Sequence, residues 1–314
     1  MLVSDGESHF SLFSSLTKPP SPLYHYTSME GLLGIGRSGK IYASDTRYLN
    51  DSTDSAYVFN FLENHIAQRI SGGTDHDQKY YKKLSSALKT LRMSEVFVAS
   101  FSEDGDSLSQ WRAYSPGGLG FSIGFDAESL ITAHVPDPKT GKPNSVTSSL
   151  RKITYLKDGA SLQEELLNDG KALGVALASF IPRTDSIDPS GATAALLAVT
   201  APTFKHDAFR DEREWRLILL NASGQLSAKE RERRLFYGEG LGAMPGKQFR
   251  AGKSMLVPYV EAEPNVDDSY FIKEVIVGPT PHPELSVKSV EAFFQSLNHA
   301  EVTVRPSKVP YRHW

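Results

Sequence analysis

Two glutamates one residue apart carry the strongest chemical signal in this sequence. Glu212 and Glu214 precede an apolar run, 215–220, that is typical of a buried strand. Side chains two residues apart share one face of a strand, so the two carboxylates are expected to lie together. Two like charges on one face repel each other and destabilise the fold unless water solvates them, cations pair with them or the protein's function requires them. Paired carboxylates can stabilise a cationic sugar intermediate, as they do in glycosidases.

The same two glutamates also have a purely structural interpretation. Their carboxylates could lie on an exposed edge or form ion pairs with neighbouring arginines, namely Arg210, Arg213 or Arg216. The pattern favours the catalytic and the structural interpretation about equally.

A histidine followed by hydroxyl residues forms a second segment, Leu23–Ser28. His25 lies in a short apolar run, and Thr27 or Ser28 is suited to cap the helix expected to follow. An imidazole beside the free backbone amides of a helix start can bind a sugar. The alternative is a half-buried histidine whose ring is bonded to a neighbouring carbonyl.

Aromatic residues mark a third segment, which follows the polar end of a strand at Ser100. Trp111 and Tyr114 are three residues apart, so they share one face of the helix expected over 108–114. Rings placed in this way could stack on a planar ligand ring. Core packing is the alternative, and it is the commoner fate of such aromatics.

The elements that must position these segments are short strands scattered among helices. Strands are expected at 23–26, 41–44, 96–100, 120–125, 215–220, 271–277 and 302–305, with another inside 248–260. Helices are expected after the Thr27 or Ser28 cap, twice within 55–91, and at 108–114, 164–180, 192–201 and 287–297. Because regular βαβ alternation is missing, this order predicts an α+β fold. We expect a flexible leader at 1–22 and a single domain at 23–314, with helical insertions near 55–91 and 160–201.

The composition excludes several kinds of site. The 314-residue chain has no cysteine, which rules out thiolate catalysis, Cys-ligated zinc and iron–sulfur clusters. No histidine–carboxylate group has metal-ligand spacing, so no metal site is expected. A net charge of −3 shows no bias toward nucleic acid or membranes. Without a secretory signal or an apolar run of membrane-spanning length, the chain is expected to be cytoplasmic.

Taken together, the three segments resemble the pattern of a bacterial family of unknown function. That pattern reads Leu-Tyr-His-Tyr-Thr-Ser, then Ser-Phe-Ser-Glu…Trp…Tyr…Gly, then Phe…Glu-x-Glu-Trp-Arg, and it often ends in Val-Gly-Pro and Val-Pro-Tyr-Arg. The corresponding stretches here begin at Leu23, Ser100, Phe209, Val277 and Val309. The similarity covers most of the chain, although it supplies no activity.

The chain also resembles the ADP-ribosyltransferases. His25-Tyr26-Thr27 is similar to the His-x-Thr/Ser motif on the first strand of the diphtheria-toxin and poly(ADP-ribose) polymerase type. Glu212-x-Glu214 is similar to the Glu-x-Glu motif of the arginine-modifying branch. The order of the blocks also matches. This resemblance implies an ADP-ribosyltransferase-like fold, in which a split β-sheet surrounds a cleft for NAD, the substrate.

The resemblance further implies roles for the first two segments. His25 would bond the adenosine ribose of NAD, and the backbone of Tyr26 would hold the nicotinamide amide. Thr27 and Ser100 would belong to the same binding set. Tyr114 or Trp111 would stack on the nicotinamide ring.

For the third segment, the resemblance implies that Glu214 is the catalytic carboxylate and that Glu212 faces the acceptor. Positive charge builds on the ribose as nicotinamide leaves, and a carboxylate would stabilise that transition state. The implied function is transfer of ADP-ribose to a macromolecular acceptor, protein or nucleic acid, or hydrolysis of NAD. A bacterial toxin or phage-defence role follows by analogy only.

Two alternatives remain open at this point. The chain could be a catalytically inactive sensor that binds nucleotides or nucleic acid on the same fold. It could also be a structural or interaction protein in which Glu212 and Glu214 are simply ion-paired. The acidic third segment argues against a phosphotransferase acting on RNA 2′-phosphates, which would use a basic pair there.

Overall fold

The computed structural model describes most of the predicted domain. Described are residues 18–49, 53–72, 95–114, 120–143, 146–157, 201–221, 244–252, 254–265 and 270–311, with single residues and pairs between 74 and 92. The predicted insertion near 160–201 lies outside the described residues, apart from its last residue, and so does most of the leader. The described end of that leader is tied to the domain, because the Ser21 hydroxyl bonds Asp126 at 3.1 Å.

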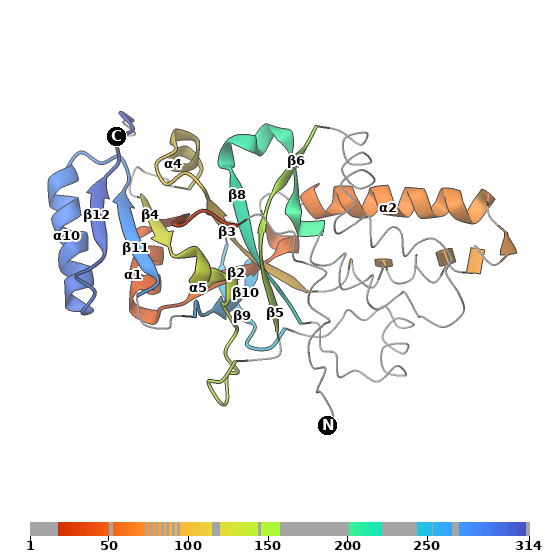
Figure 1. Ribbon diagram of the computed structural model, residues 1–314, viewed down its shortest axis with the longest axis horizontal. Helices are drawn as coiled ribbons and strands as arrows, with labels where there is room; N and C mark the ends of the chain where they lie inside the picture. Colours follow the sequence, from red (N-terminus) through yellow and green to blue (C-terminus); the bar gives the residue numbers. More distant parts are fainter. Residues whose placement is uncertain are drawn as a thin grey trace, which may run out of the picture.

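The fold is α+β, as the sequence predicts, with a mixed and largely antiparallel sheet (Figure 1). The strands of the large sheet are β1 (Leu23–Ser28), β2 (Ile41–Asp45), β3 (Val96–Ser102), β4 (Gly120–Phe125), β5 (Thr147–Lys152), β8 (Glu214–Leu220), β9 (Gln248–Ala251), β10 (Leu256–Ala262), β11 (Ile272–Val277) and β12 (Thr303–Pro306). A separate parallel pair consists of β6 (Thr154–Leu156) and β7 (Phe204–His206). The main helices are α1 (Met29–Ser38), α2 (Thr53–Gly72), α4 (Leu108–Tyr114), α5 (Ala127–Ile131) and α10 (Pro283–Ser296).

The sheet forks at β3, which has three neighbouring strands. One edge of β3 pairs with β8 along its whole length. On its other edge, β3 pairs with β2 at Phe97 and Val98 and with β1 only at Ser102. Beyond the fork, one arm continues from β1 through β4 and β11 to β12, and the other continues from β2 through β10 to β9. The stretch of β3 around Ser100 therefore faces a gap between two diverging strands.

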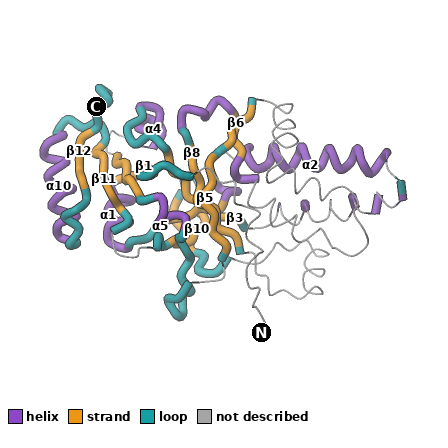
Figure 2. The backbone as a smooth tube through the Cα atoms, viewed as in Figure 1, coloured by secondary structure: helices purple, strands orange, loops and turns teal. Residues whose placement is uncertain are grey.

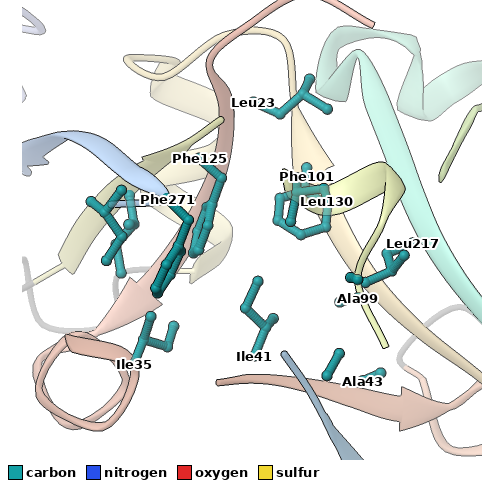
Figure 3. Packing of buried hydrophobic residues seen from close by; sticks show 14 of the residues in the cluster. Leu23, Ile35, Ile41, Ala43, Ala99, Phe101, Phe125, Leu130, Leu217 and Phe271 are labelled. Carbon is teal, nitrogen blue, oxygen red and sulfur yellow. The ribbon is translucent and has the colours of Figure 1, made fainter. Parts of the chain in front are cut away.

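Apolar residues on one face of the sheet build the main core. Alternate positions of β3 and β8 contribute to it, which is the period-two pattern of strands. In Figure 3, the rings of Phe125 and Phe271 lie face to face, with centroids 5.8 Å apart, and Phe101 lies near them. Ser100, Glu214 and Arg216 lie on the opposite face of β3 and β8. Packing in the core therefore fixes the two strands that carry these polar residues.

Helix α1 shows how the sequence sets a local boundary. Ser28 is its N-cap, because its Oγ accepts a hydrogen bond from the backbone N–H of Gly31 at 3.2 Å. The helix ends at Gly39, whose φ of 70° is a left-handed conformation that suits glycine. Both boundaries agree with the sequence prediction.

Some elements differ from their predicted form. The single strand expected inside 248–260 is instead a hairpin of β9 and β10, because the chain reverses after Ala251. Strands β5, β6 and β7 were not predicted, because β5 is mostly polar and β6 and β7 are only three residues long. Helix α10 begins at Pro283, four residues earlier than expected, because proline fits the first turn of a helix.

The predicted insertion near 55–91 is helical where it is described. Helix α2 projects from one end of the molecule, while α10 covers the opposite end (Figure 1). The described residues from 75 to 92 are also helical, apart from the gaps between them. Val58, Ile66 and Leu88 are fully or almost fully buried, so the insertion packs against other parts of the chain.

Candidate functional site

His25 occupies the fork of the sheet. Its Nδ1 atom lies 2.9 Å from the carbonyl oxygen of Ser100, on the edge of β3 that faces the gap. A carbonyl can only accept a hydrogen bond, so Nδ1 carries the proton and Nε2 of the neutral ring is an acceptor. The half-buried imidazole thus replaces a strand partner for Ser100, and its Nε2 has no hydrogen-bond partner among the residues that the structure describes. The carbonyl-bonded histidine that the sequence left open is what the structure shows, and this bond alone does not exclude a ligand.

The environment of His25 predicts a pH-dependent stability. Burial is the main cause that lowers the pKa of His25; the Ser100 carbonyl opposes this shift and the charge of Arg250 adds to it. In the unfolded chain the histidine pKa is about 6.5, so between that value and the lower native pKa the unfolded state binds more protons. The free energy of unfolding should therefore fall as the pH drops below about 6.5. Urea unfolding at pH 7.5 and 5.5 should show a smaller fall for His25→Asn, and an equal fall would contradict the assignment.

The two predicted glutamates belong to a buried ion-pair network. Arg216 binds Glu214 through two nitrogens, with Nε 2.7 Å from Oε1 and Nη2 3.1 Å from Oε2. Lys205 lies between the glutamates, with Nζ 2.7 Å from Glu212 Oε2 and 3.1 Å from Glu214 Oε2. Arg216 also donates to the backbone carbonyl of Pro202 at 2.7 Å. Two negative and two positive charges therefore balance one another inside the protein.

The two carboxylates differ in how many acceptor sites remain open. Glu214 is 5% exposed and accepts two bonds from Arg216, one from Lys205 and one from the Ser100 side chain. A carboxylate has about four lone-pair sites, so Glu214 is saturated. The Glu212 side chain is 18% exposed, and among the described residues its Oε1 has no hydrogen-bond partner. Glu212 is thus the carboxylate that can accept a bond from a ligand.

The pKa values of the pair are shifted in opposite directions. Burial raises the pKa of Glu212, and the nearby charge of Glu214 adds to this effect against the opposing influence of Lys205. Burial would also raise the pKa of Glu214, but Arg216 and Lys205 outweigh it and lower that pKa. The shifts thus favour the charged form of Glu214 and oppose the charged form of Glu212. Such a separation within a carboxylate pair is common at functional sites.

Two members of this network were missed in the sequence. Lys205 comes from β7 and Tyr155 from β6, and the Tyr155 hydroxyl accepts a hydrogen bond from the backbone N–H of Glu214 at 2.8 Å. These two strands form the small parallel pair beside the sheet. A lone lysine between a phenylalanine and a histidine gives no sequence signal for a cluster. Of Arg210, Arg213 and Arg216, only Arg216 binds one of the two glutamates among the described residues.

Trp111 does not fit its predicted role as a stacking ring. It is fully buried, its ring packs edge-on against Tyr26 at 4.8 Å, and its Nε1 donates to Asp106 at 2.9 Å. The tryptophan therefore belongs to the core, the alternative left open in the sequence. Tyr26 is also buried, and its hydroxyl bonds the carbonyl of Asp104 at 2.8 Å. Both side chains hold the loop before α4 and so fix α4 beside β1 (Figure 2).

This placement predicts a stability defect for Trp111→Phe. The change removes the indole N–H bonded to Asp106 and leaves a small void in the core. We expect the free energy of unfolding to fall by about 1–3 kcal/mol. Tyr114→Phe, on the same helix but 41% exposed, should change it by no more than about 0.5 kcal/mol. Urea denaturation of both variants checks this, and equal stabilities would contradict the core assignment of Trp111.

Tyr114 remains available as a stacking ring. It is 41% exposed at the end of α4. Partial burial raises the pKa of its hydroxyl, and the charge of Glu212 raises it further, which places the ring beside the network. Thr27 has a structural contact instead: a Cβ on Gly31 would lie 1.9 Å from its Oγ1, so the threonine packs closely on α1.

The described residues offer neither a metal centre nor a membrane span. No group of three or more His, Asp or Glu side chains among them could hold a metal ion. No helix in the described part of the chain is both long and apolar enough to cross a membrane.

Comparison with known proteins identifies a related family for part of the chain. Residues 110–217 match the model of a protein family of unknown function, DUF2971. The matched range contains Tyr114, Glu212 and Glu214, while His25 lies before it. This match confirms in part the expected resemblance to a family of unknown function. Neither the curated proteins nor the solved structures gave a match.

Proposed function

We propose that the protein binds NAD in the fork of its sheet and cleaves the bond between ribose and nicotinamide. The supporting observation is that three segments far apart in the sequence border the same stretch of β3. His25 of β1 bonds the backbone carbonyl of Ser100, Glu214 of β8 is paired with Ser102, and α4, which ends at Tyr114, packs against the helical turn Asp207–Glu212. The acceptor of ADP-ribose is a macromolecule, or water if the reaction is hydrolysis.

The forked sheet is consistent with an ADP-ribosyltransferase-like fold. That fold splits its sheet around the dinucleotide, and here β1 and β2 diverge from β3 at Ser100. The histidine segment lies on one side of the gap, and the glutamate segment lies on the strand beyond β3. We therefore infer that the α+β architecture belongs to the ADP-ribosyltransferase-like fold.

The bonding within the network divides the roles of the two glutamates. Glu212 has an open oxygen, so we assign it the contact with the ribose 2′-hydroxyl that strengthens as positive charge develops. Glu214 is saturated, so it holds Arg216 and Lys205 in place and acts as a positioning residue. The catalytic role that the resemblance implied for Glu214 is therefore assigned to Glu212.

The other residues would act on the two ends of the dinucleotide. The free Nε2 of His25 accepts a hydrogen bond from a hydroxyl of the adenosine ribose. The Tyr114 face packs on the cationic nicotinamide ring, which favours binding before the bond breaks. As the C–N bond breaks, its electron pair leaves with nicotinamide, which departs as a neutral molecule. A nucleophile on the acceptor, or water, then forms the new bond to the ribose carbon and loses its proton.

The saturation of Glu214 also favours a second candidate function. An ion-paired Glu-x-Glu is what a catalytically inactive module on the same fold would retain. Such a protein would bind a nucleotide at the fork without releasing nicotinamide.

Incubation of the purified protein with NAD, alone and with cell lysate, separates these functions. Released nicotinamide and labelled acceptor are measured together with NAD binding by calorimetry. Release above the uncatalysed rate supports the enzyme. Binding without release supports the inactive module, and the absence of both would exclude the dinucleotide site.

A further inference from the structure

An exposed arginine lies on the same side of the sheet as Ser100 and Glu214. Arg250 is on β9, near the end of the second arm of the fork, and its Nη2 donates to the Ser44 hydroxyl at 3.0 Å. Directly paired residues share a face, so Ser44 lies on the same face as Val98. Val98 and Ser100 are two residues apart on β3 and share that face, which also carries Arg216 of β8. The guanidinium therefore lies over the sheet at the fork.

Within the described part of the chain, the charge of Arg250 is not balanced by a carboxylate. Among the described residues it has no ion pair, whereas Arg47, Arg216 and Arg305 each contact a carboxylate. Its charge is felt at His25, whose pKa it helps to lower, and at Tyr259. An arginine that repels a proton from the candidate site is suited to attract an anion there.

An aromatic pair borders the same arginine. The rings of Tyr42 and Tyr259 are 4.1 Å apart at 31°, and Tyr42 is 46% exposed. Tyr259 is paired with Ser44 and with Gln248, so both rings and Arg250 belong to neighbouring positions on β2, β10 and β9. A guanidinium beside a hydroxyl and an exposed ring matches a phosphate group that carries a nucleoside.

We propose that Arg250 and Ser44 form a subsite for the diphosphate group of the dinucleotide, with Tyr42 beside the attached base. The identity of the dinucleotide rests on the proposed function, whereas the presence of an anion subsite does not. Arg250 would fix the diphosphate through charge-assisted hydrogen bonds and so orient the ribose that His25 binds.

Calorimetric titrations with ADP-ribose and with inorganic pyrophosphate test this subsite. Arg250→Gln should weaken the binding of both probes by about ten- to a hundredfold. Arg250→Lys should recover part of the loss, because it keeps the charge but not the planar donors. Arg37→Gln is the matched control, since Arg37 is an exposed arginine on α1 and its removal changes the net charge equally. Its affinities should equal those of the wild type.

Several results would overturn the subsite. One is equal affinity of wild type and Arg250→Gln for ADP-ribose, and another is the absence of binding of either probe to the wild type. Dependence on Arg250 for a single-stranded oligonucleotide but not for ADP-ribose would show a nucleic-acid contact instead. If the wild type releases nicotinamide and Arg250→Gln has an unchanged KM, the subsite is wrong while the function stands. ADP-ribose binding that depends on Arg250 without any release retains the subsite and rejects the function.

Discussion

Glu214→Ala is expected to lower the free energy of unfolding by about 3–5 kcal/mol. The variant leaves Arg216 and Lys205 buried, with 3% and 7% exposure, and removes the carboxylate that accepts three of their hydrogen bonds. An uncompensated buried charge is far more costly than the loss of a surface pair. Chemical denaturation followed by circular dichroism measures the change.

A surface ion pair supplies the control for this experiment. Glu261 on β10 binds Lys40 at 3.0 Å, but the side chains of both residues are about a quarter exposed. Glu261→Ala should cost no more than about 1 kcal/mol. If Glu214→Ala were as mild as the control, the network would not be the buried structural centre described above.

Glu212→Gln is expected to reduce the rate of nicotinamide release by about 10²–10³. Glutamine keeps the shape and an acceptor oxygen for Lys205, but it removes the negative charge next to the developing positive charge of the ribose. The binding of NAD should change much less, because the ribose is neutral in the ground state. Nicotinamide release and melting temperature are measured on the same samples.

Glu103→Gln serves as the matched control for Glu212→Gln. Glu103 is also a partly buried glutamate bonded to a lysine, with Lys152 Nζ 2.7 Å away, but it has no assigned catalytic role. Its rate should remain close to that of the wild type. Full activity of Glu212→Gln, or an equal loss in both variants, would remove Glu212 from the reaction.

Much of the fold was predictable because its strands have strong apolar patterns. Leu23–Ser28, Val96–Ser102 and Glu214–Leu220 contain short runs of apolar, β-branched or aromatic residues, so their positions were predicted to within a few residues. The fork was not deducible from these patterns. It depends on the pairing of β3 with two different strands along one edge, and pairing is a property of tertiary structure.

The candidate site was predictable in part, for a related reason. Unusual local sequence marks His25, Tyr114 and the two glutamates, and of these the structure joins Glu212 and Glu214 in one buried network. The partners that decide their chemistry came from elsewhere: Lys205 from a three-residue strand and Arg250 from an edge strand. Trp111 was assigned to the site because helical spacing cannot show which side of a short helix faces the core.

The central claim is that NAD binds beside His25, and NMR of the imidazole groups tests it most directly. The signals of the nine histidines are recorded during a titration with NAD, and the His25→Asn variant identifies the signal of His25. The account predicts that the His25 signal shifts saturably and that this shift is weaker in Arg250→Gln at equal NAD concentration. An unchanged His25 signal at millimolar NAD, or shifts confined to other histidines, would contradict it.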